Sequence, residues 1–321
     1  MQGTNDEPVP GRHRRPSRRR FLLLATAGAG ALGTAGVGWS AFGDETPPPR
    51  VFSSQQDIDG RRSDITALLD AADPAAVAAW ITGTGTAPDA IPTELDTQVN
   101  ALADAAAAGT GTDRAAVVVS RVRTAATQRT IWDRKYDFLR TGSGGAGTFG
   151  VITDETRATY PTELGTDPQW DPDKASHRTV WASMTPDERQ IEILRTSTAP
   201  GVSRHHLGSD ADFFDTTPQN WTDDGPQAAH YAWLRANASR YGFLQTYSAA
   251  SAQDTPAISQ ERWHWSYAPV AEAVLGFVRA NDGLITGALD RLWSYDPARF
   301  TYIRANWRNY MFHVNEQAYF G

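Results

Sequence analysis

Two short segments of this sequence, about fifty residues apart, gather side chains that bind metal ions. The first contains His205 and Asp212 and the second contains Glu261 and His264, in a chain of 321 residues with seven histidines and no cysteine. A catalytic Zn²⁺ needs three or four such ligands and leaves a position for water. We therefore expect a fold that brings both segments to one ion, with His205, Asp212 and His264 as ligands and Glu261 acting on the water.

The first segment predicts two short strands joined by a tight reversal. Gly208 lies between His205 and Asp212, and glycine adopts a positive φ without steric cost. In the second strand Asp210 and Asp212 would share one face, because side chains alternate along a strand.

The second segment also predicts a strand, since residues 263–267 are mostly strong β-formers. Alternation places His264 on one face and Trp263 on the other, against a core. Glu261 lies three positions before His264 and would point away from it in a straight strand. A bend just before the strand is therefore needed for Glu261 to reach water at the metal.

The composition excludes several classes of protein. The formal net charge is −7, and residues 1–43 carry six arginines against two acidic residues, so the rest of the chain has a charge of −11. Such an acidic body argues against a surface that binds nucleic-acid phosphates. The absence of cysteine excludes disulfides, thiolate nucleophiles and cysteine-ligated zinc.

The first 43 residues predict an export signal. The run Ser17-Arg18-Arg19-Arg20-Phe21-Leu22 fits the twin-arginine pattern, and a short, weakly apolar stretch follows it as far as Val37. No clean A-x-A cleavage site precedes Asp44, so retention as an uncleaved membrane anchor stays open. We expect the protein in the cell envelope or outside the cell. Residues 44–54, with three consecutive prolines, predict a stiff linker.

Residues 55–141 predict a helical region. Apolar residues recur at helical spacing from Val118 to Leu139, with Asp113 as a cap and Thr141-Gly142 as a stop. Shorter helices are expected at Asp57–Ala71, Pro74–Ile81 and Pro92–Ala108. Because histidines and carboxylates do not cluster in this region, we expect a helical bundle packed on the catalytic domain. The glycine-rich residues 142–150 predict the boundary between them.

Residues 151–321 predict the zinc domain with a helical C-terminal extension. Thr185-Pro186 opens a helix that runs into residues 191–194, which either continue it or form a strand. Further helices are expected at 226–241, Val270–Asn281, Gly283–Ser294 and Tyr302–Tyr310. The expected fold class is α+β: a small antiparallel sheet with flanking helices carries the zinc site, with a mainly helical N-terminal region and a helical C-terminal tail.

The spacing of the two segments also resembles a known family. The pattern S-x-H-x-x-G-x-[A/D]-x-D, followed downstream by E-x-W-H, is similar to that of the zinc D-Ala-D-Ala carboxypeptidases of the VanY type and their peptidoglycan endopeptidase relatives. The matching residues are Ser203, His205, Gly208, Asp210, Asp212, Glu261, Trp263 and His264. Between them, residues 233–238 resemble the family's W-L-x-x-N-A, and Tyr241-Gly242-Phe243 matches its Y-G-F.

The resemblance implies a D-Ala-D-Ala peptidase or Hedgehog-like fold and a role for each matching residue. His205, Asp212 and His264 would bind Zn²⁺, and Glu261 would be the catalytic base. The residues expected around them, in contact with the ligands or the substrate, are Ser203, Arg204, His206, Asp210 and Trp263. The family also carries an S-G-Y-R-S segment whose arginine binds the substrate or steadies the transition state, and we take Arg195, in Arg195-Thr196-Ser197, as its equivalent. Arg262 stands where the family usually has proline after the glutamate.

Three functions are compatible with these residues. The first is a zinc D,D-carboxypeptidase that removes D-Ala from the peptidoglycan stem peptide, and the second is an endopeptidase of the same chemistry that cuts within stem peptides or cross-bridges. The third is a non-catalytic binding domain stabilised by zinc. The presence of Glu261 argues against the third, because a structural zinc has no use for a base.

Overall fold

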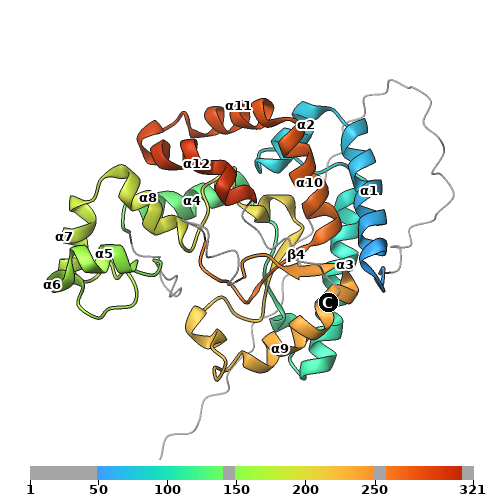
Figure 1. The fold of residues 1–321 in the computed structure, drawn as a ribbon, viewed down its shortest axis with the longest axis horizontal. Coiled ribbons are helices and arrows are strands. Elements are labelled where there is room, and N and C mark those ends of the chain that lie inside the picture. Colours follow the sequence, from blue (N-terminus) through green and yellow to red (C-terminus); the bar gives the residue numbers. More distant parts are fainter. Residues whose placement is uncertain (1–48, 140–148, 249–257, 313–321) are drawn as a thin grey trace, which may run out of the picture. The chain divides into compact units, whose positions relative to one another are not determined.

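The computed structural model describes residues 49–139, 149–248 and 258–312. The predicted export signal, residues 1–43, and most of the predicted boundary at 142–150 lie outside the described residues. All described residues belong to one compact unit, which runs from Thr46 to Gly321. The sheet is a small part of a fold that is otherwise largely helical (Figure 1).

Helices form before, between and after the strands of the sheet. The α-helices are α1 Gln55–Ala71, α2 Pro74–Ile81, α3 Ala90–Thr110, α4 Ala125–Tyr136, α5 Asp154–Thr159, α6 Pro161–Leu164, α7 Ala175–Ser183, α8 Pro186–Leu194, α9 Ala228–Asn237, α10 Ala268–Ala280, α11 Asp282–Trp293 and α12 Thr301–Phe312. Short 3₁₀ helices are η1 Arg114–Ala116, η2 Arg204–Leu207, η3 Pro218–Trp221, η4 Ala238–Tyr241 and η6 Pro297–Phe300. Most of the predicted helices are confirmed, and residues 191–194 continue α8 rather than forming a strand.

Local capping explains where two of these helices begin. The Ser54 hydroxyl accepts the Asp57 backbone N–H, and the Asp57 carboxylate accepts the N–H of Ser54 in return. Thr185 and Glu188 form the same reciprocal capping box at the start of α8, where proline follows the cap. These bonds satisfy backbone donors that the first turn of a helix leaves free.

Four short strands form one antiparallel sheet in the order β1-β2-β4-β3. The strands are β1 Val118–Ser120, β2 Asp210–Phe213, β3 Phe243–Gln245 and β4 His264–Tyr267. Asp212 is paired with His264 across β2 and β4, and Asp210 with Ser266. Because paired residues of neighbouring strands present their side chains on the same face, this register brings both predicted segments together.

The helix predicted between Asp113 and Leu139 is wrong over its first half. Val118–Ser120 is strand β1, paired with β2, and the helix begins only after Thr124, whose hydroxyl accepts the Thr127 N–H. Residues 117–119 are three consecutive valines, and β-branched side chains favour a strand when a neighbouring strand is available. The predicted division at 142–150 stays a prediction, and the sheet contains strands from both sides of it.

The strand predicted around His205 is also wrong, whereas the reversal after it is confirmed. Residues 204–207 form the 3₁₀ helix η2, and Gly208 follows with a φ of 70°. The Arg123 N–H donates to the carbonyl of His205, so this segment is held by residues that follow β1. The tight turn lets both neighbouring histidines face inward.

The C-terminal helices pack on helices that come earlier in the chain. Helix α10 packs along α1, and α12 packs on α8 (Figure 1). The Phe300 ring stacks between Trp132 of α4 and Trp293 of α11, with centroid distances of 5.7 and 5.5 Å. The α+β fold class with a small antiparallel sheet is confirmed.

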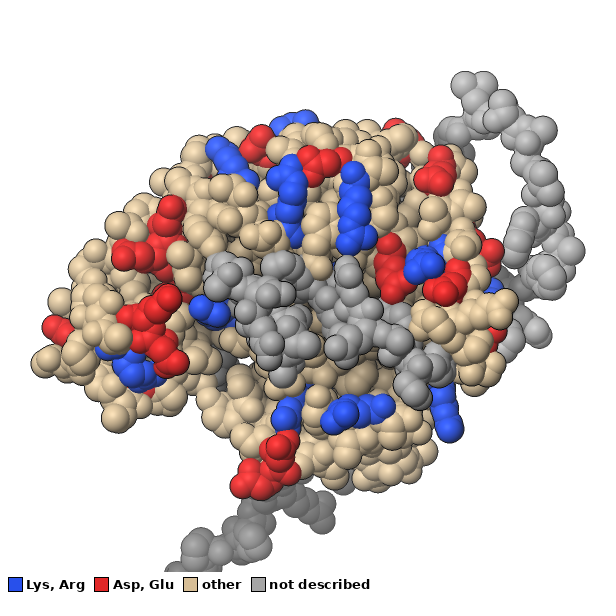
Figure 2. Space-filling model, viewed as in Figure 1, with Lys and Arg blue, Asp and Glu red and all other residues tan. Residues whose placement is uncertain are grey.

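Two further observations concern the charges on the surface and the apolar character of the helices. Acidic and basic side chains are interspersed over the face seen in Figure 2. Within the described ranges, none of the helices combines the length and the apolar character that a membrane crossing requires.

Candidate metal and catalytic site

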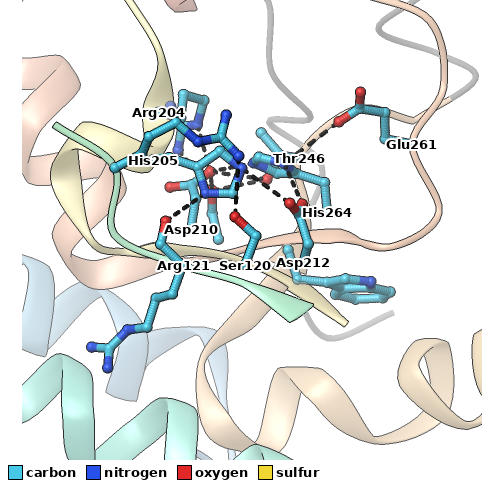
Figure 3. A network of polar contacts seen from close by, with 12 residues as sticks. Ser120, Arg121, Arg204, His205, Asp210, Asp212, Thr246, Glu261 and His264 are labelled. Atoms are coloured by element: carbon cyan, nitrogen blue, oxygen red, sulfur yellow. Dashed lines mark hydrogen bonds and ion pairs between the residues drawn. The ribbon is translucent and has the colours of Figure 1, made fainter. Parts of the chain in front are cut away.

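Three of the predicted residues converge on one point in the protein interior. Nδ1 of His264 lies 3.1 Å from Oδ1 of Asp212, and Nε2 of His205 lies 3.3 Å from Oδ2 of the same carboxylate. One ligand atom from each residue lies within 4.8 Å of the others, and all three side chains are buried (Figure 3). Two imidazoles and a carboxylate at this spacing can share one metal ion.

Each histidine is oriented by a second partner on its other nitrogen. Nδ1 of His205 lies 2.7 Å from the carbonyl oxygen of Arg121, and Nε2 of His264 lies 2.9 Å from Oδ1 of Asp210. Both partners are acceptors, so each ring donates from that nitrogen and turns the other one toward Asp212. Second partners of this kind fix the tautomer of metal-binding histidines.

Asp210 lies behind His264 and is itself surrounded by donors. Nε of Arg204 donates to it at 3.0 Å and the Ser209 hydroxyl at 2.7 Å, and the Ser266 hydroxyl also donates to it. Burial raises the pKa of Asp210, but the charge of Arg204 and the hydrogen bond from His264 lower it by a larger amount. The pKa of Asp210 therefore lies well below its usual range. Asp210 therefore stays ionised and holds the His264 ring. Arg204 is occupied in this buried ion pair.

The converging group attracts positive charge. Burial raises the pKa of Asp212, but the two histidines beside it bring the pKa well below its ordinary value. Burial lowers the pKa of His264, yet the two carboxylates beside it, Asp210 and Asp212, raise it to about 10. Oδ1 of Asp212 is buried and has no aligned hydrogen-bond donor among the described residues, although Nδ1 of His264 is 3.1 Å away. The ionised Asp212, with its unsatisfied oxygen, suits a cation, and a metal ion bound at this point would displace the second proton of the His264 ring.

Glu261 reaches the group from a bend, as predicted. The His264 N–H donates to the Glu261 carbonyl at 3.4 Å across a turn, and Oε2 of Glu261 lies 3.5 Å from Nδ1 of His264. Burial raises the pKa of Glu261 to about 7, against the opposing charge of His264. A carboxyl group with a pKa near neutrality can both accept and return a proton at working pH.

A cavity of about 330 Å³ opens over these residues. His205, Asp212, Glu261 and His264 line it together with the predicted Ser203 and Trp263. Tyr247, which the sequence did not single out, also lines it, and its ring centroid lies 4.8 Å from that of His264.

His206 lies outside the ligand group and joins two backbone segments. Its Nε2 accepts the Gly201 N–H at 3.0 Å, and its Nδ1 lies 2.6 Å from the carbonyl oxygen of Arg123. The ring is therefore neutral, with its proton on Nδ1. Burial agrees with this assignment, because it lowers the pKa of His206 to about 4. His206 holds the backbone of Arg123 beside the ligands.

Arg123 lines the cavity, whereas Arg195 lines a different one. Nη1 of Arg123 donates to Oε1 of Gln128 at 2.9 Å and Nη2 donates to the Ser120 hydroxyl at 3.1 Å, which fixes the guanidinium. Arg195 directly follows α8 and lines a second cavity of about 340 Å³ with residues 151–155 and Ser259. Of these two arginines, Arg123 is the one that shares a cavity with the metal group.

The sequence contains a signal for Arg123. Ser120-Arg121-Val122-Arg123-Thr124 fits the S-G-Y-R-S pattern at its first and fourth positions, with threonine for serine at the fifth. The helical spacing of apolar residues from Val118 to Leu139 conceals this segment, because it predicts one continuous helix there. In the structure the segment is the extended connection between β1 and α4.

The fold and the site together define a class. A buried histidine–aspartate–histidine group, with a glutamate of raised pKa beside it on a cavity, is the arrangement expected of a hydrolytic metal centre. The comparison with protein families is consistent with that class. A model described as VanY, D-alanyl-D-alanine carboxypeptidase, matches residues 90–270, which is more than half of the chain. The chain belongs to the VanY D-alanyl-D-alanine carboxypeptidase family, a family of zinc peptidases.

Further comparisons concern the N-terminus and individual proteins. Residues 10–40 match a model described as the twin-arginine (TAT) signal of the ubiquitinol-cytochrome c reductase Fe-S subunit. No curated protein matched the chain.

Two solved structures resemble the chain. VanYB in complex with D-alanine-D-alanine has 20% identity and a TM-score of 0.32, with 58% of this chain and 76% of that chain covered. A glutamate-to-alanine mutant of the vancomycin-resistance D,D-pentapeptidase VanY, in complex with Zn(II), has 22% identity and a TM-score of 0.30, with 57% and 75% covered.

Proposed function

We propose that this protein is a zinc-dependent D-alanyl-D-alanine carboxypeptidase that trims the stem peptides of peptidoglycan. The observation that carries the proposal is the convergence of His205, Asp212 and His264 beside Glu261 in one cavity. Membership of the family supports both the reaction and a substrate that ends in D-alanyl-D-alanine.

The residues present fit a zinc ion. His205 and His264 each keep one ring nitrogen toward Asp212, and the carboxylate has a buried oxygen without an aligned donor among the described residues. Nitrogen and oxygen ligands of this kind, three in number, are typical of catalytic zinc. Zinc held there would supply a Lewis acid that activates water and polarises the scissile carbonyl.

The protein's own residues would move the proton and stabilise charge. Glu261 would accept a proton from the attacking water and later deliver it to the leaving amine, for which a pKa of about 7 is well suited. Arg123, fixed by Gln128 and Ser120, would face the negative charge that develops on the carbonyl oxygen. We assign this role to Arg123 in place of Arg195, because Arg123 lines the cavity.

The predicted neighbours would act through the ligands or the substrate. Asp210 and Arg204 would keep the His264 ring in place, and His206 would keep the Arg123 backbone in place. Ser203 and Trp263 line the cavity and would contact the peptide.

One observation favours an endopeptidase as a second candidate. The cavity of the metal group and the cavity at Arg195 share Val151 and Ser259 as lining residues. A peptide that continues past the scissile bond on both sides needs room on each side, which two adjacent cavities would provide. An endopeptidase acting within stem peptides or cross-bridges would use both cavities, whereas a carboxypeptidase needs one closed end.

The proposed location is outside the cytoplasm. The match of residues 10–40 to a twin-arginine signal supports export in the folded state, to the cell envelope or beyond. Whether the signal is removed or remains as a membrane anchor can be read from the N-terminal sequence of the exported protein. We retain the division into a signal (1–43), a linker (44–54), a helical region (55–141) and a zinc domain (151–321) as a proposal.

The function is tested by digesting purified pentapeptide muropeptides with the wild type and Glu261→Gln, followed by mass analysis. Loss of one terminal alanine with the wild type alone is the expected result. Internal cuts would identify the endopeptidase instead. No turnover by a zinc-loaded wild type would leave only a zinc-stabilised binding domain.

A further inference from the structure

Lys135 is an unusual residue in this chain. The sequence has thirty basic residues, of which only Lys135 and Lys174 are lysines. Lys135 lies near the end of α4, is 4% exposed and lines the same cavity as the metal group. Long cationic side chains are rarely buried to this extent without an acidic partner.

Hydroxyl groups, rather than carboxylates, surround the ammonium of Lys135. Its Nζ donates to the Ser197 hydroxyl at 2.7 Å and to the Thr196 hydroxyl at 3.2 Å. Among the described residues no carboxylate lies within ion-pair distance of Nζ. Burial lowers the pKa of Lys135 to about 7, and the charge of Arg134 lowers it further while Glu261 opposes this.

Arg134 adds a second incompletely bonded cation to the same wall. It lines the cavity next to Lys135, and its Nη1 is buried without a hydrogen-bond partner in the described part of the chain. Its guanidinium carbon lies 5.3 Å from the centroid of the Phe149 ring. A buried lysine next to a half-buried arginine is unfavourable in the free protein because the two cations repel each other, and an arriving anion would relieve that cost.

The cavity is therefore lined by side chains of opposite charge. Asp212 and Glu261 line it from β2 and from the segment before β4, and Arg134 and Lys135 line it from α4. Gln128, also on α4, accepts from Arg123 and donates to the carbonyl of Thr198, next to the hydroxyls that Lys135 contacts. A peptide seated with its scissile bond at the metal group could meet the cations of α4 with another part of its chain.

We propose that Lys135, with Arg134 and the hydroxyls of Thr196 and Ser197, forms a subsite that binds a carboxylate of the peptide substrate and sets its specificity. This inference rests on the proposed function. The carboxylate has two possible sources, which are the C-terminal group released with the last residue and an acidic side chain on the acyl side of the scissile bond. Both would bind through the same charge-assisted hydrogen bonds.

The test is equilibrium binding in a background that cannot turn over. Three zinc-loaded proteins are compared, each also carrying Glu261→Gln: the parent, Lys135→Met and the control Lys174→Met. Lys174 pairs with Asp167 outside the cavity, so the control removes the same charge elsewhere. The probes are a capped lysyl-D-Ala-D-Ala tripeptide, its C-terminal amide, and the amide with glutamate in place of lysine, all titrated by calorimetry.

We expect Lys135→Met to weaken binding about tenfold or more for a carboxylate-bearing probe, and not to weaken binding of the lysyl amide, which has no carboxylate. Weaker binding of the free acid alone identifies the C-terminal carboxylate as the ligand, and weaker binding of the glutamyl amide alone identifies the side chain. Equal affinities for every probe in Lys135→Met and the parent would overturn the subsite.

Two further measurements separate this role from a merely structural one. In the catalytically intact protein, Lys135→Met should raise KM about tenfold with kcat changed less than about threefold, and Lys135→Arg should restore most of the KM. If Lys135→Met fails to fold, Arg134→Gln keeps Lys135 in place and should still weaken the same probe severalfold. A wild type that hydrolyses D-Ala-D-Ala peptides while both variants keep its KM would refute the subsite alone. A wild type that neither binds nor hydrolyses them would refute the proposed function as well.

Discussion

The two walls of the cavity compensate their charges in different ways. On the wall formed by β2 and β4, the ionised Asp210 pairs with Arg204 and His264, and the group of His205, Asp212 and His264 has the geometry to hold a cation. On the α4 wall, Arg134 and Lys135 face hydroxyls and an aromatic ring, without a carboxylate within reach among the described residues. The first wall is thus suited to bind a cation and the second to bind an anion.

Removing a ligand from the first wall is the most severe way to break this contrast. We expect His264→Ala to abolish both zinc retention and turnover. Only His205 and Asp212 would remain as ligands, and Asp210 would lose the histidine that it holds. Metal content after gel filtration and peptidase activity are the measurements. His230→Ala is the control, since His230 stacks on Phe214 and does not line the cavity. Full activity in zinc-free His264→Ala would contradict the assignment.

Glu261→Gln separates chemistry from metal binding. The amide cannot accept a proton, so we expect kcat to fall by about 10²–10⁴-fold. The zinc content should stay unchanged, because the metal group of His205, Asp212 and His264 is intact. Steady-state kinetics and metal analysis on the same preparation test this, and a variant with wild-type kcat would exclude Glu261 as the base.

Arg123→Met and Arg195→Met sharpen the comparison between the two cavities. Loss of a cation aimed at a developing oxyanion costs about 10²–10³-fold in kcat. We expect this loss for Arg123→Met, and a change of less than about threefold for Arg195→Met on a dipeptide substrate. A larger loss of kcat in Arg195→Met than in Arg123→Met would assign the stabilisation of the oxyanion to Arg195 instead.

Asp210→Asn tests the partner behind the first wall. A neutral amide holds the His264 ring less firmly, and loss of such a partner typically lowers metal affinity by about 10–100-fold. Competition with a zinc chelator measures the affinity. An unchanged zinc affinity would mean that Asp210 serves only the ion pair with Arg204.

We expect substitution of His206 to have the smallest effect on turnover and a separate effect on the free energy of unfolding. Its pKa is about 4 in the folded protein, below the ordinary histidine value of 6.5, so the unfolded chain binds the proton more readily between these values. Stability contributed by the neutral ring is therefore complete above pH 6.5 and lost as pH falls toward 4, by about 3 kcal/mol at most. Glu261, whose pKa of about 7 lies above its ordinary value, titrates over the same range in the opposite sense. The loss is therefore measured as the difference between the wild type and a variant without this histidine, by urea denaturation of zinc-free protein at about pH 7.5 and about pH 5.

His206→Gln is the matched variant for that measurement. It should lose less stability than the wild type between the same two pH values, because glutamine does not titrate. Activity of its zinc-loaded form at neutral pH should stay within about threefold of the wild type. Identical pH dependence in both proteins would show that His206 is not the group that titrates.

Much of this arrangement could be predicted from the sequence, because the information is local. Period-two alternation places His264 and Asp212 on inward faces, and caps such as Thr185 mark helix starts. The bend before His264 follows from the need to bring Glu261 to the metal, and the structure contains it.

The predictions that are wrong depend on partners distant in the chain. Val118–Ser120 fits a helical pattern, but it pairs with β2, about ninety residues later, and no local signal reports that partner. His205 lies in a 3₁₀ turn because Arg121 and Arg123 bond to that segment from outside. A helix over β1 would place Arg123 on its surface, which leaves Arg195 as the better candidate from sequence alone. Lys135 likewise carries no local signal, because its importance comes from the cavity that it lines.

The order of strands in the sheet has a consequence for how the protein matures. The third ligand lies on β4, which pairs with both β2 and β3, and β2 in turn pairs with β1. A nascent chain therefore cannot close the sheet until residue 267 has left the ribosome. Pairings over such sequence distances form slowly. The metal group is accordingly assembled late in the folding of the chain.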